Sequence, residues 1–285
     1  MQFPRRTFFI IVLSAVIFSG TSCERHAQPI YNGKPLSKWI ADLNPQKPDA
    51  TRDQAQIVIR QIGTNSIPFL IGEMRELGSL WEKMGATNFN NSDELTDRLV
   101  NLRDAFETLG PIAKPAVPAL VILLNSPTNG ANDGAAYALT QIDAQIAVGV
   151  LTHALTNQFA GARISAANEL YEVRSNADMA VPNLIQCLKD NSAEKEASSM
   201  LRYCSAAALG FIESSPEKAI PALAEALLQD KNSAVRLAAA RSLGQFGKNA
   251  QSAILALTQA STNDPESFVR RAAATALNKI QEQSP

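Results

Sequence analysis

The chain has 285 residues, of which 46% are hydrophobic and 19% are charged, and its formal net charge is -1. This composition excludes a disordered chain and is typical of a globular protein or an elongated array of repeats. A nearly neutral, slightly acidic chain gives no electrostatic basis for binding nucleic acid, which we therefore exclude as a partner.

The first residues have the layout of an export signal. Two arginines are followed by an apolar run from Phe8 to Phe18 and then by small residues. Eleven apolar residues are too few to span a bilayer comfortably, so we predict a signal peptide over residues 1–22. The stretch "GTSC" resembles the lipobox of bacterial lipoproteins, although Gly20 stands where an aliphatic residue is usual. The resemblance implies a lipid on Cys23, while ordinary cleavage and an uncleaved anchor remain open.

The segment after the signal predicts a connection and then a short helix. Residues 23–34 lack a periodic apolar pattern and contain proline and glycine, so we expect a tether between the membrane and the folded part. Within residues 35–49, apolar side chains recur at helical spacing. We expect this segment to form an N-terminal capping helix that covers the open end of the folded part.

A pattern with a period near 34 residues recurs along the rest of the chain. The clearest copies are "VRLAAARSLGQF" (235–246) and "VRRAAATALNKI" (269–280), each of which ends on an apolar anchor residue. The anchors are Ile62, Leu109, Ile142, Val173, Ile212, Phe246 and Ile280. Successive anchors lie 47, 33, 31, 39, 34 and 34 residues apart. A repeated period of this length predicts a repeat architecture, and the long first gap indicates an insertion.

Each copy predicts two helices. In the copy that ends at Phe246, the residues Val235, Ala239 and Leu243 fall on one helical face, and alanines let a neighbouring helix approach closely. A second amphipathic segment comes after each anchor, such as "IPALAEALL" at 220–228. A single helix pair cannot bury its own apolar face, whereas stacked pairs can.

The repeats resemble HEAT repeats, specifically the short variety of the phycobilisome lyases. The residues that carry this resemblance best are Asp230, Val235, Arg236, Ala239, Ala240, Leu243 and Gly244. The resemblance implies an all-α fold: a right-handed α-solenoid of about six to seven helix pairs over residues 50–282. We predict a loop insertion at 78–94, which is rich in Asn, Gly and Ser and carries Trp81.

A column of arginines stands ten residues before most anchors. Its members are Arg52, Arg163, Arg202, Arg236 and Arg270, and Asp230 and Asp264 lie six residues before the last two. One interpretation is a structural ladder that ties adjacent repeats together, with the aspartates as partners and helix caps. The other is a basic stripe for an anionic partner. The acidic balance of the chain and the role of this pair in resembling families favour the ladder.

Chemistry has few candidates in this sequence. The histidines are His26 and His153, and no spacing of His, Cys or carboxylates predicts a metal site, a nucleophile or a cofactor. Cys187 and Cys204 occupy columns that otherwise hold small residues. We expect two buried thiols, with a disulfide as the alternative that export would allow. We predict that the protein is not an enzyme and needs no cofactor.

Binding is expected on the second helices, which line the concave face of HEAT solenoids. The outward column there is Ile122, His153, Gln186, Glu225 and Gln259, and simple solvation is the alternative interpretation. We predict a non-catalytic protein-interaction scaffold of the bacterial cell envelope, anchored to the membrane through Cys23 and facing the periplasm or exterior. Alternatives are an envelope receptor for a small molecule or glycan, based on Trp81, and an enzyme of phycobilin-lyase type.

Overall fold

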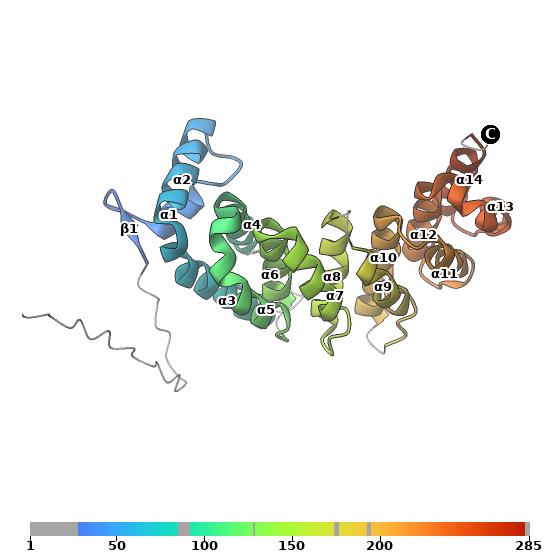
Figure 1. Ribbon diagram of the computed structural model, residues 1–285, viewed down its shortest axis with the longest axis horizontal. Helices are drawn as coiled ribbons and strands as arrows, with labels where there is room; N and C mark the ends of the chain where they lie inside the picture. Colours follow the sequence, from blue (N-terminus) through green and yellow to red (C-terminus); the bar gives the residue numbers. More distant parts are fainter. Residues whose placement is uncertain (1–27, 85–91, 128, 174–176, 193–194, 283–285) are drawn as a thin grey trace, which may run out of the picture.

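The computed structural model describes residues 28–84, 92–127, 129–173, 177–192 and 195–282. The helices of these segments stack side by side along the long axis of the molecule, in chain order from α1 to α14 (Figure 1). The fold is therefore a helical-repeat array. The predicted signal peptide at 1–22 and the predicted lipid site at Cys23 lie outside the described residues.

A small hairpin precedes the first helix. Strands β1 (Ile30–Tyr31) and β2 (Lys34–Pro35) pair antiparallel across a two-residue turn. The turn residues Asn32 and Gly33 have φ angles of 51° and 72°. Positive φ at both positions is the requirement of a type I′ hairpin turn, and Asn-Gly is its strongest short-range sequence signal.

This hairpin corrects the prediction of a tether for its described part, residues 28–34. The Tyr31 hydroxyl donates a hydrogen bond of 2.5 Å to Oε1 of Gln61. The indole Nε1 of Trp39 donates to the Tyr31 carbonyl over 3.2 Å. The Asn32-Gly33 turn and these hydrogen bonds hold the segment against the first repeat. The sequence prediction missed this structure because the segment has no apolar periodicity. The capping segment forms helix α1 (Leu36–Ala41), in which Leu36, Trp39 and Ile40 are buried.

Repeats of two consecutive helices make up the rest of the described chain. The pairs are α2 (Asp49–Ile62) with α3 (Ile67–Met84), α4 (Ser92–Leu109) with α5 (Val117–Leu124), α6 (Asn129–Ile142) with α7 (Ala144–Ala154), α8 (Ala160–Val173) with α9 (Val181–Leu188), α10 (Lys195–Ile212) with α11 (Pro216–Gln229), and α12 (Ser233–Gln245) with α13 (Ile254–Asn263). Helix α14 (Ser267–Glu282) comes last. We call α2, α4, α6, α8, α10, α12 and α14 the first helices, and their partners the second helices.

Glycine ends several first helices and reverses the chain. Gly63, Gly110 and Gly247 come after α2, α4 and α12 and have φ angles of 59°, 50° and 50°. Glycine adopts this left-handed conformation without steric cost, which makes it the usual residue after a helix end. Each of these glycines begins a short 3-10 turn: η1 (Gly63–Ser66), η4 (Gly110–Ala116) and η6 (Gly247–Ala253).

First helices pack directly against one another. Helix α10 contacts both α8 and α12, and α12 contacts α14. At the α10–α12 crossing, a Cβ added to Gly210 would lie 2.4 Å from Oγ of Ser242, so only glycine fits there. Small side chains in this row therefore set the close spacing of the repeats.

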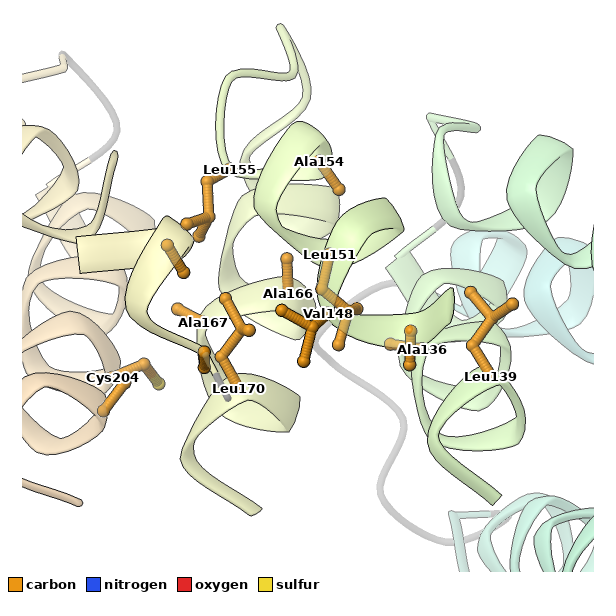
Figure 2. Close-up of a cluster of buried hydrophobic side chains, with 14 of the residues drawn as sticks. Ala136, Leu139, Val148, Leu151, Ala154, Leu155, Ala166, Ala167, Leu170 and Cys204 are labelled. Carbon is orange, nitrogen blue, oxygen red and sulfur yellow. The ribbon is translucent and has the colours of Figure 1, made fainter. Parts of the chain in front are cut away.

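Larger apolar side chains fill the space between the two helices of each pair and the next pair. Figure 2 shows Leu139 of α6, Val148 and Leu151 of α7 and Leu170 of α8 gathered in one cluster. Each of the four is at most 3% exposed. The core is thus shared between neighbouring repeats, as the sequence pattern predicts.

The predicted loop at 78–94 is wrong at both ends. Helix α3 continues through Gly78 and Trp81 to Met84, and α4 begins at Ser92. Within the predicted loop, residues 85–91 lie outside the described residues. A Cβ on Gly78 would stand 2.8 Å from Cβ of Ala131, so this glycine permits close packing of α3 on α6 and does not break the helix.

Candidate functional site

The outward column of the second helices is exposed along the whole row. Ile122 lies on α5, His153 on α7, Gln186 on α9, Glu225 on α11 and Gln259 on α13, and every one of these side chains is exposed. We call the surface that they share the second-helix face. The second helices contact each other less extensively than the first helices do, so this face has recesses between neighbouring repeats.

One recess of this face lies between α9 and α11 and has a volume of about 330 Å³. Its lining residues are Leu188, Lys189, Asn191, Arg202, Ala222, Glu225, Ala226, Gln229, Asp230 and Lys231. Leu188, Ala222 and Ala226 are buried and form an apolar floor. Polar and charged side chains form the rim. We call this recess the α9–α11 groove.

Two opposite charges bridge the rim of the α9–α11 groove. Nζ of Lys189 lies 3.4 Å from Oε2 of Glu225, and their side chains are 55% and 52% exposed. Exposed ion pairs contribute little to folding stability, so a partner can displace this one at small cost. Of the five residues in the predicted outward column, Glu225 is the one that lines the groove.

A buried ion pair holds the wall of the same groove. Nε and Nη2 of Arg202 donate to the two carboxylate oxygens of Asp230 over 2.7 and 3.1 Å. Nη1 of Arg202 also donates to the Asp190 carbonyl over 3.0 Å. This bidentate geometry fixes α10 against the end of α11, which keeps the groove walls in place.

The next repeat has the same arrangement. Arg236 donates to Asp264 over 2.7 and 3.0 Å and to the Asp230 carbonyl over 3.0 Å. Burial of Asp264 raises its pKa, but the hydrogen bonds from Arg236 and from the Glu266 amide outweigh burial, so the pKa is lowered overall. Each arginine side chain thus pairs with the aspartate 28 residues downstream. Toward the aspartate six residues upstream, which we predicted as the partner, Arg236 reaches the backbone carbonyl only.

The ladder weakens toward both ends. Nη2 of Arg163 lies 3.5 Å from Oδ1 of Asp190, and Arg270 donates to the carbonyls of Asp264 and Pro265. Asn132 takes the place of the arginine in the third repeat, and its buried Nδ2 donates to three carbonyls at the end of α5. From the third repeat onward, the residue of this column donates to backbone carbonyls at the end of the preceding second helix. The pairing with aspartate is added to these hydrogen bonds in the later repeats.

Neither Trp81 nor His153 lines the α9–α11 groove. Trp81 is 43% exposed and packs on Gly130 at the start of α6. His153 lies in the last turn of α7. Among the residues that the structure describes, no group of three or more His, Cys, Asp or Glu side chains is placed to hold a metal ion.

Both cysteines of the repeat region are buried free thiols. Cys187 and Cys204 are each 6% exposed. Burial raises the pKa of each thiol to about 11. Sγ of Cys187 lies 3.4 Å from the carbonyl oxygen of Leu155, which accepts its hydrogen bond. The two side chains fill small positions between repeats, as the alignment of the columns predicts.

One buried carboxyl group escaped the sequence interpretation. Glu169 of α8 is 1% exposed, and its Oε2 has no hydrogen-bond partner. Burial raises its pKa to about 7, and the charge of Asp133 adds to the effect. The repeat alignment contains the signal that would have found it. Four residues before the anchors, the other repeats after the first carry Ala105, Ala138, Ala208, Ser242 and Ala276.

Comparison with known proteins supports this architecture. Residues 193–278 match the family model of HEAT repeats. The structure is similar to that of the karyopherin Kap121p bound to the extreme C-terminus of the protein phosphatase Cdc14p, with 13% identity, a TM-score of 0.57, and coverage of 86% of this chain and 29% of the karyopherin. The complex of Kap121p with the SUMO protease Ulp1p gives 12% identity, a TM-score of 0.56 and the same coverages.

An engineered protein is also similar, with 20% identity and a TM-score of 0.38, over 87% of this chain and 98% of that one. No curated protein sequence matches the chain. Residues 193–278 are therefore similar to HEAT repeats, and the chain has the fold of a helical-repeat protein, which confirms that part of the sequence prediction. It spans 29% of the length of the karyopherins.

Proposed function

We propose that the protein is a non-catalytic scaffold that binds a protein partner on its second-helix face, centred on the α9–α11 groove. The observation that carries the proposal is the groove itself: an apolar floor, a charged rim and walls held by the Arg202–Asp230 pair. Rigid walls lower the entropic cost of ordering the surface when a partner binds.

The composition of the groove supports a protein partner. Its rim offers both signs of charge, from Lys189, Lys231 and Glu225, together with amide side chains. A mixed polar rim around an apolar floor is the usual anatomy of a protein interface. The karyopherin structures, whose partners are a phosphatase segment and a protease, are consistent with this use of the fold.

A protein partner is favoured over a small molecule or glycan. The second hypothesis depends on Trp81 in a binding loop, and Trp81 is instead a helical residue packed on α6. Small-molecule sites enclose most of the ligand surface, whereas the α9–α11 groove is partly open to solvent. No observation on the described residues favours the hypothesis of a lyase.

The cellular location belongs to the same proposal. The export signal at 1–22 and the lipobox-like "GTSC" support a scaffold that is attached to the envelope through a lipid on Cys23 and faces the periplasm or exterior. Metabolic labelling with a fatty-acid probe tests this directly. Label on the full chain that is absent from Cys23→Ser supports the lipid, and equal labelling of both rules it out.

The binding experiment compares charge reversals on one helix. Glu225→Lys breaks the bridge to Lys189 and places a cation at the rim of the groove. Glu217→Lys changes the same charge at an exposed position in the first turn of α11, outside the groove. Proteins captured from envelope extracts of the native host by each full-length variant are quantified by mass spectrometry.

We expect one set of captured proteins to fall about tenfold with Glu225→Lys and to remain with Glu217→Lys. Equal capture by the two variants would remove the groove as the binding site. Circular dichroism of both variants controls for folding, and both substitutions are at exposed positions where the fold is expected to tolerate them.

A further inference from the structure

A second groove lies on the opposite helices of the last repeats, between the first helices α12 and α14. Its volume is about 470 Å³. Its lining residues are Leu237, Arg241, Gly244, Gln245, Phe268, Arg271, Ala272, Thr275, Ala276 and Lys279. We call it the α12–α14 groove. It shares no lining residue with the α9–α11 groove.

Three cations and no acidic side chain line the α12–α14 groove. Arg241 belongs to α12, Arg271 and Lys279 belong to α14, and all three are exposed. None of them takes part in an ion pair among the described residues, whereas Arg236, on the same helix as Arg241, is bound to Asp264. The groove is thus a local basic site on a chain whose net charge is -1.

Arg270 and Arg271 are adjacent in the sequence but make different contacts. Arg270 donates to the backbone carbonyls of Asp264 and Pro265 and belongs to the repeat ladder. Arg271, the next residue, lines the groove instead. Stacking of the repeats therefore uses the first arginine and leaves the second one available to a ligand.

The floor between the cations is apolar. Leu237, Phe268 and Ala272 are half-buried, and the helices approach closely at Gly244, where an added Cβ would lie 3.1 Å from Cβ of Ala276. An apolar side chain of a ligand could cover this floor. Carboxylates on either side of that side chain would then reach the guanidinium and ammonium groups.

The other repeats act as an internal control for these positions. Arg241 aligns with Tyr137, Asn168 and Ala207; Arg271 aligns with Asp133, Ile164 and Tyr203; and Lys279 aligns with Gln141, Glu172 and Phe211. Residues of every chemical type occupy these three columns, so the stack does not require a cation at any of them. Three cations that meet in one groove are therefore not explained by the repeat framework.

We propose that the α12–α14 groove binds an acidic peptide segment of a partner protein, in which carboxylates flank at least one large apolar side chain. Charge complementarity selects the carboxylates, and the apolar floor selects the side chain between them. Three cations in a short groove are too few for the extended phosphate track that nucleic-acid binding uses. This site is separate from the second-helix face and acts independently of it.

The test begins with a random twelve-residue peptide library displayed on phage and selected against the full chain. Recovered peptides are synthesised with a fluorescent label and titrated by fluorescence anisotropy against the wild type, R241E/R271E and R241A/R271A. The charge-matched control is R75E/K218E, which reverses two exposed cations on α3 and α11, away from the groove. Thermal unfolding of each variant shows whether it is folded.

We expect the selected peptides to be rich in Asp and Glu around an aromatic or aliphatic residue. Their affinity should fall about tenfold or more in R241E/R271E, fall less in R241A/R271A, remain in R75E/K218E, and weaken as salt is raised. Glu225→Lys should leave this binding unchanged, which separates the result from the proposal for the second-helix face.

Peptides that bind all variants equally would overturn the proposal, as would a selection that yields no acidic peptides. Binding of vesicles that contain phosphatidylglycerol, or of single-stranded RNA, would also overturn it if R241E/R271E abolished that binding while no peptide depended on these arginines.

Discussion

The C-terminal repeats and the N-terminal repeats hold the same stack together in different ways. In residues 195–282, α10 and α12 are each tied to the next repeat by an arginine whose partner carboxylate is at most 7% exposed, as in Arg236–Asp264. In residues 28–127 the arginine column is interrupted at Leu99, and other contacts join the repeats. Nε of Arg60 donates to the Thr108 carbonyl over 3.0 Å, and α3 packs directly on α6.

This contrast shows that the apolar faces define the stack. The polar interactions between repeats can be of different kinds without changing it. Both regions bury the same columns of alanine, leucine and isoleucine. The polar interactions that join the repeats differ in burial between the two regions, however. Loss of one partner of a buried ion pair lowers the free energy of unfolding the most. The regular pattern of the C-terminal repeats, which made the family visible in the sequence, is therefore also the place where single polar substitutions should have their largest effects.

The largest effect is expected when the C-terminal tie is cut. Asp264→Ala leaves the guanidinium of Arg236 buried without its carboxylate partner, which costs about 3 to 5 kcal/mol in the free energy of unfolding. Urea denaturation measures the loss. The N-terminal counterpart is Asp49→Ala, which removes the partner of Arg52 from a pair whose aspartate is 84% exposed. Its cost should be below about 0.5 kcal/mol, and similar losses in the two variants would contradict the contrast.

Glu169, between the two regions, predicts a pH-dependent stability. Its pKa is raised from 4.5 to about 7, so the folded state prefers the protonated carboxyl group. The stabilisation is complete below pH 4.5 and is lost as pH rises to about 7. The shift corresponds to about 3 kcal/mol.

Urea denaturation at a series of pH values tests this prediction. Glu169→Gln should remove the fall in stability between pH 4.5 and 7 and leave the variant more stable than the wild type at pH 8. The matched control is Glu217→Gln, an exposed glutamate in the first turn of α11 that is remote from Glu169, and it should keep the pH profile of the wild type. A profile that Glu169→Gln does not change would show that another group titrates.

The next effect probes the close packing of α3 on α6 in the N-terminal region. Gly78→Ala places a Cβ 2.8 Å from Cβ of Ala131, so α3 and α6 must move apart. We expect a loss of about 1 to 3 kcal/mol in thermal or urea unfolding. Gly149→Ala is the control, because a Cβ there meets no atom within 4 Å and the helix gains a better helix former. Stabilisation by both substitutions would show that α3 and α6 can move apart without loss of stability.

The smallest effect is expected at the N-terminal hairpin. Gly33 has a φ angle of 72°, so Gly33→Ala strains the turn by about 1 kcal/mol. Amide hydrogen exchange at Leu36, which donates to the Pro29 carbonyl over 2.9 Å, should become faster. Asn32→Gly should leave the exchange rate nearly unchanged. Global unfolding should be the same in both variants, and a global loss in Gly33→Ala would mean that the hairpin is part of the cooperative core.

Prediction from the sequence succeeded where the pattern was local and repeated. The helix pairs, the buried columns and the short turns after the anchors Ile62, Leu109 and Phe246 follow from spacings of three and four residues and from the period near 34. Prediction failed where a residue type that is typical of loops has another structural role. Gly78 falls in the predicted loop but permits close packing of two helices, and Asn32-Gly33 falls in the predicted tether but forms a hairpin turn.

The candidate sites could be predicted only in part. The outward column of the second helices emerges from the repeat alignment, and its members are exposed. The grooves do not, because a groove depends on how far apart two neighbouring helices lie. The alignment nevertheless contains evidence for two of the missed features. A glutamate replaces alanine at position 169, and cations occupy positions 241, 271 and 279 that hold other residue types elsewhere.

Local sequence patterns specify the order of the helices, their apolar faces and the repeat to which each belongs, because these properties depend on residues within one turn or one period of each other. The tertiary structure, by contrast, sets which carboxylates Arg202 and Arg236 reach, namely those 28 residues downstream in the next repeat. It also decided that α9 and α11, and α12 and α14, leave grooves between them. These features depend on distances between separate repeats, which are set by the small side chains where the helices cross.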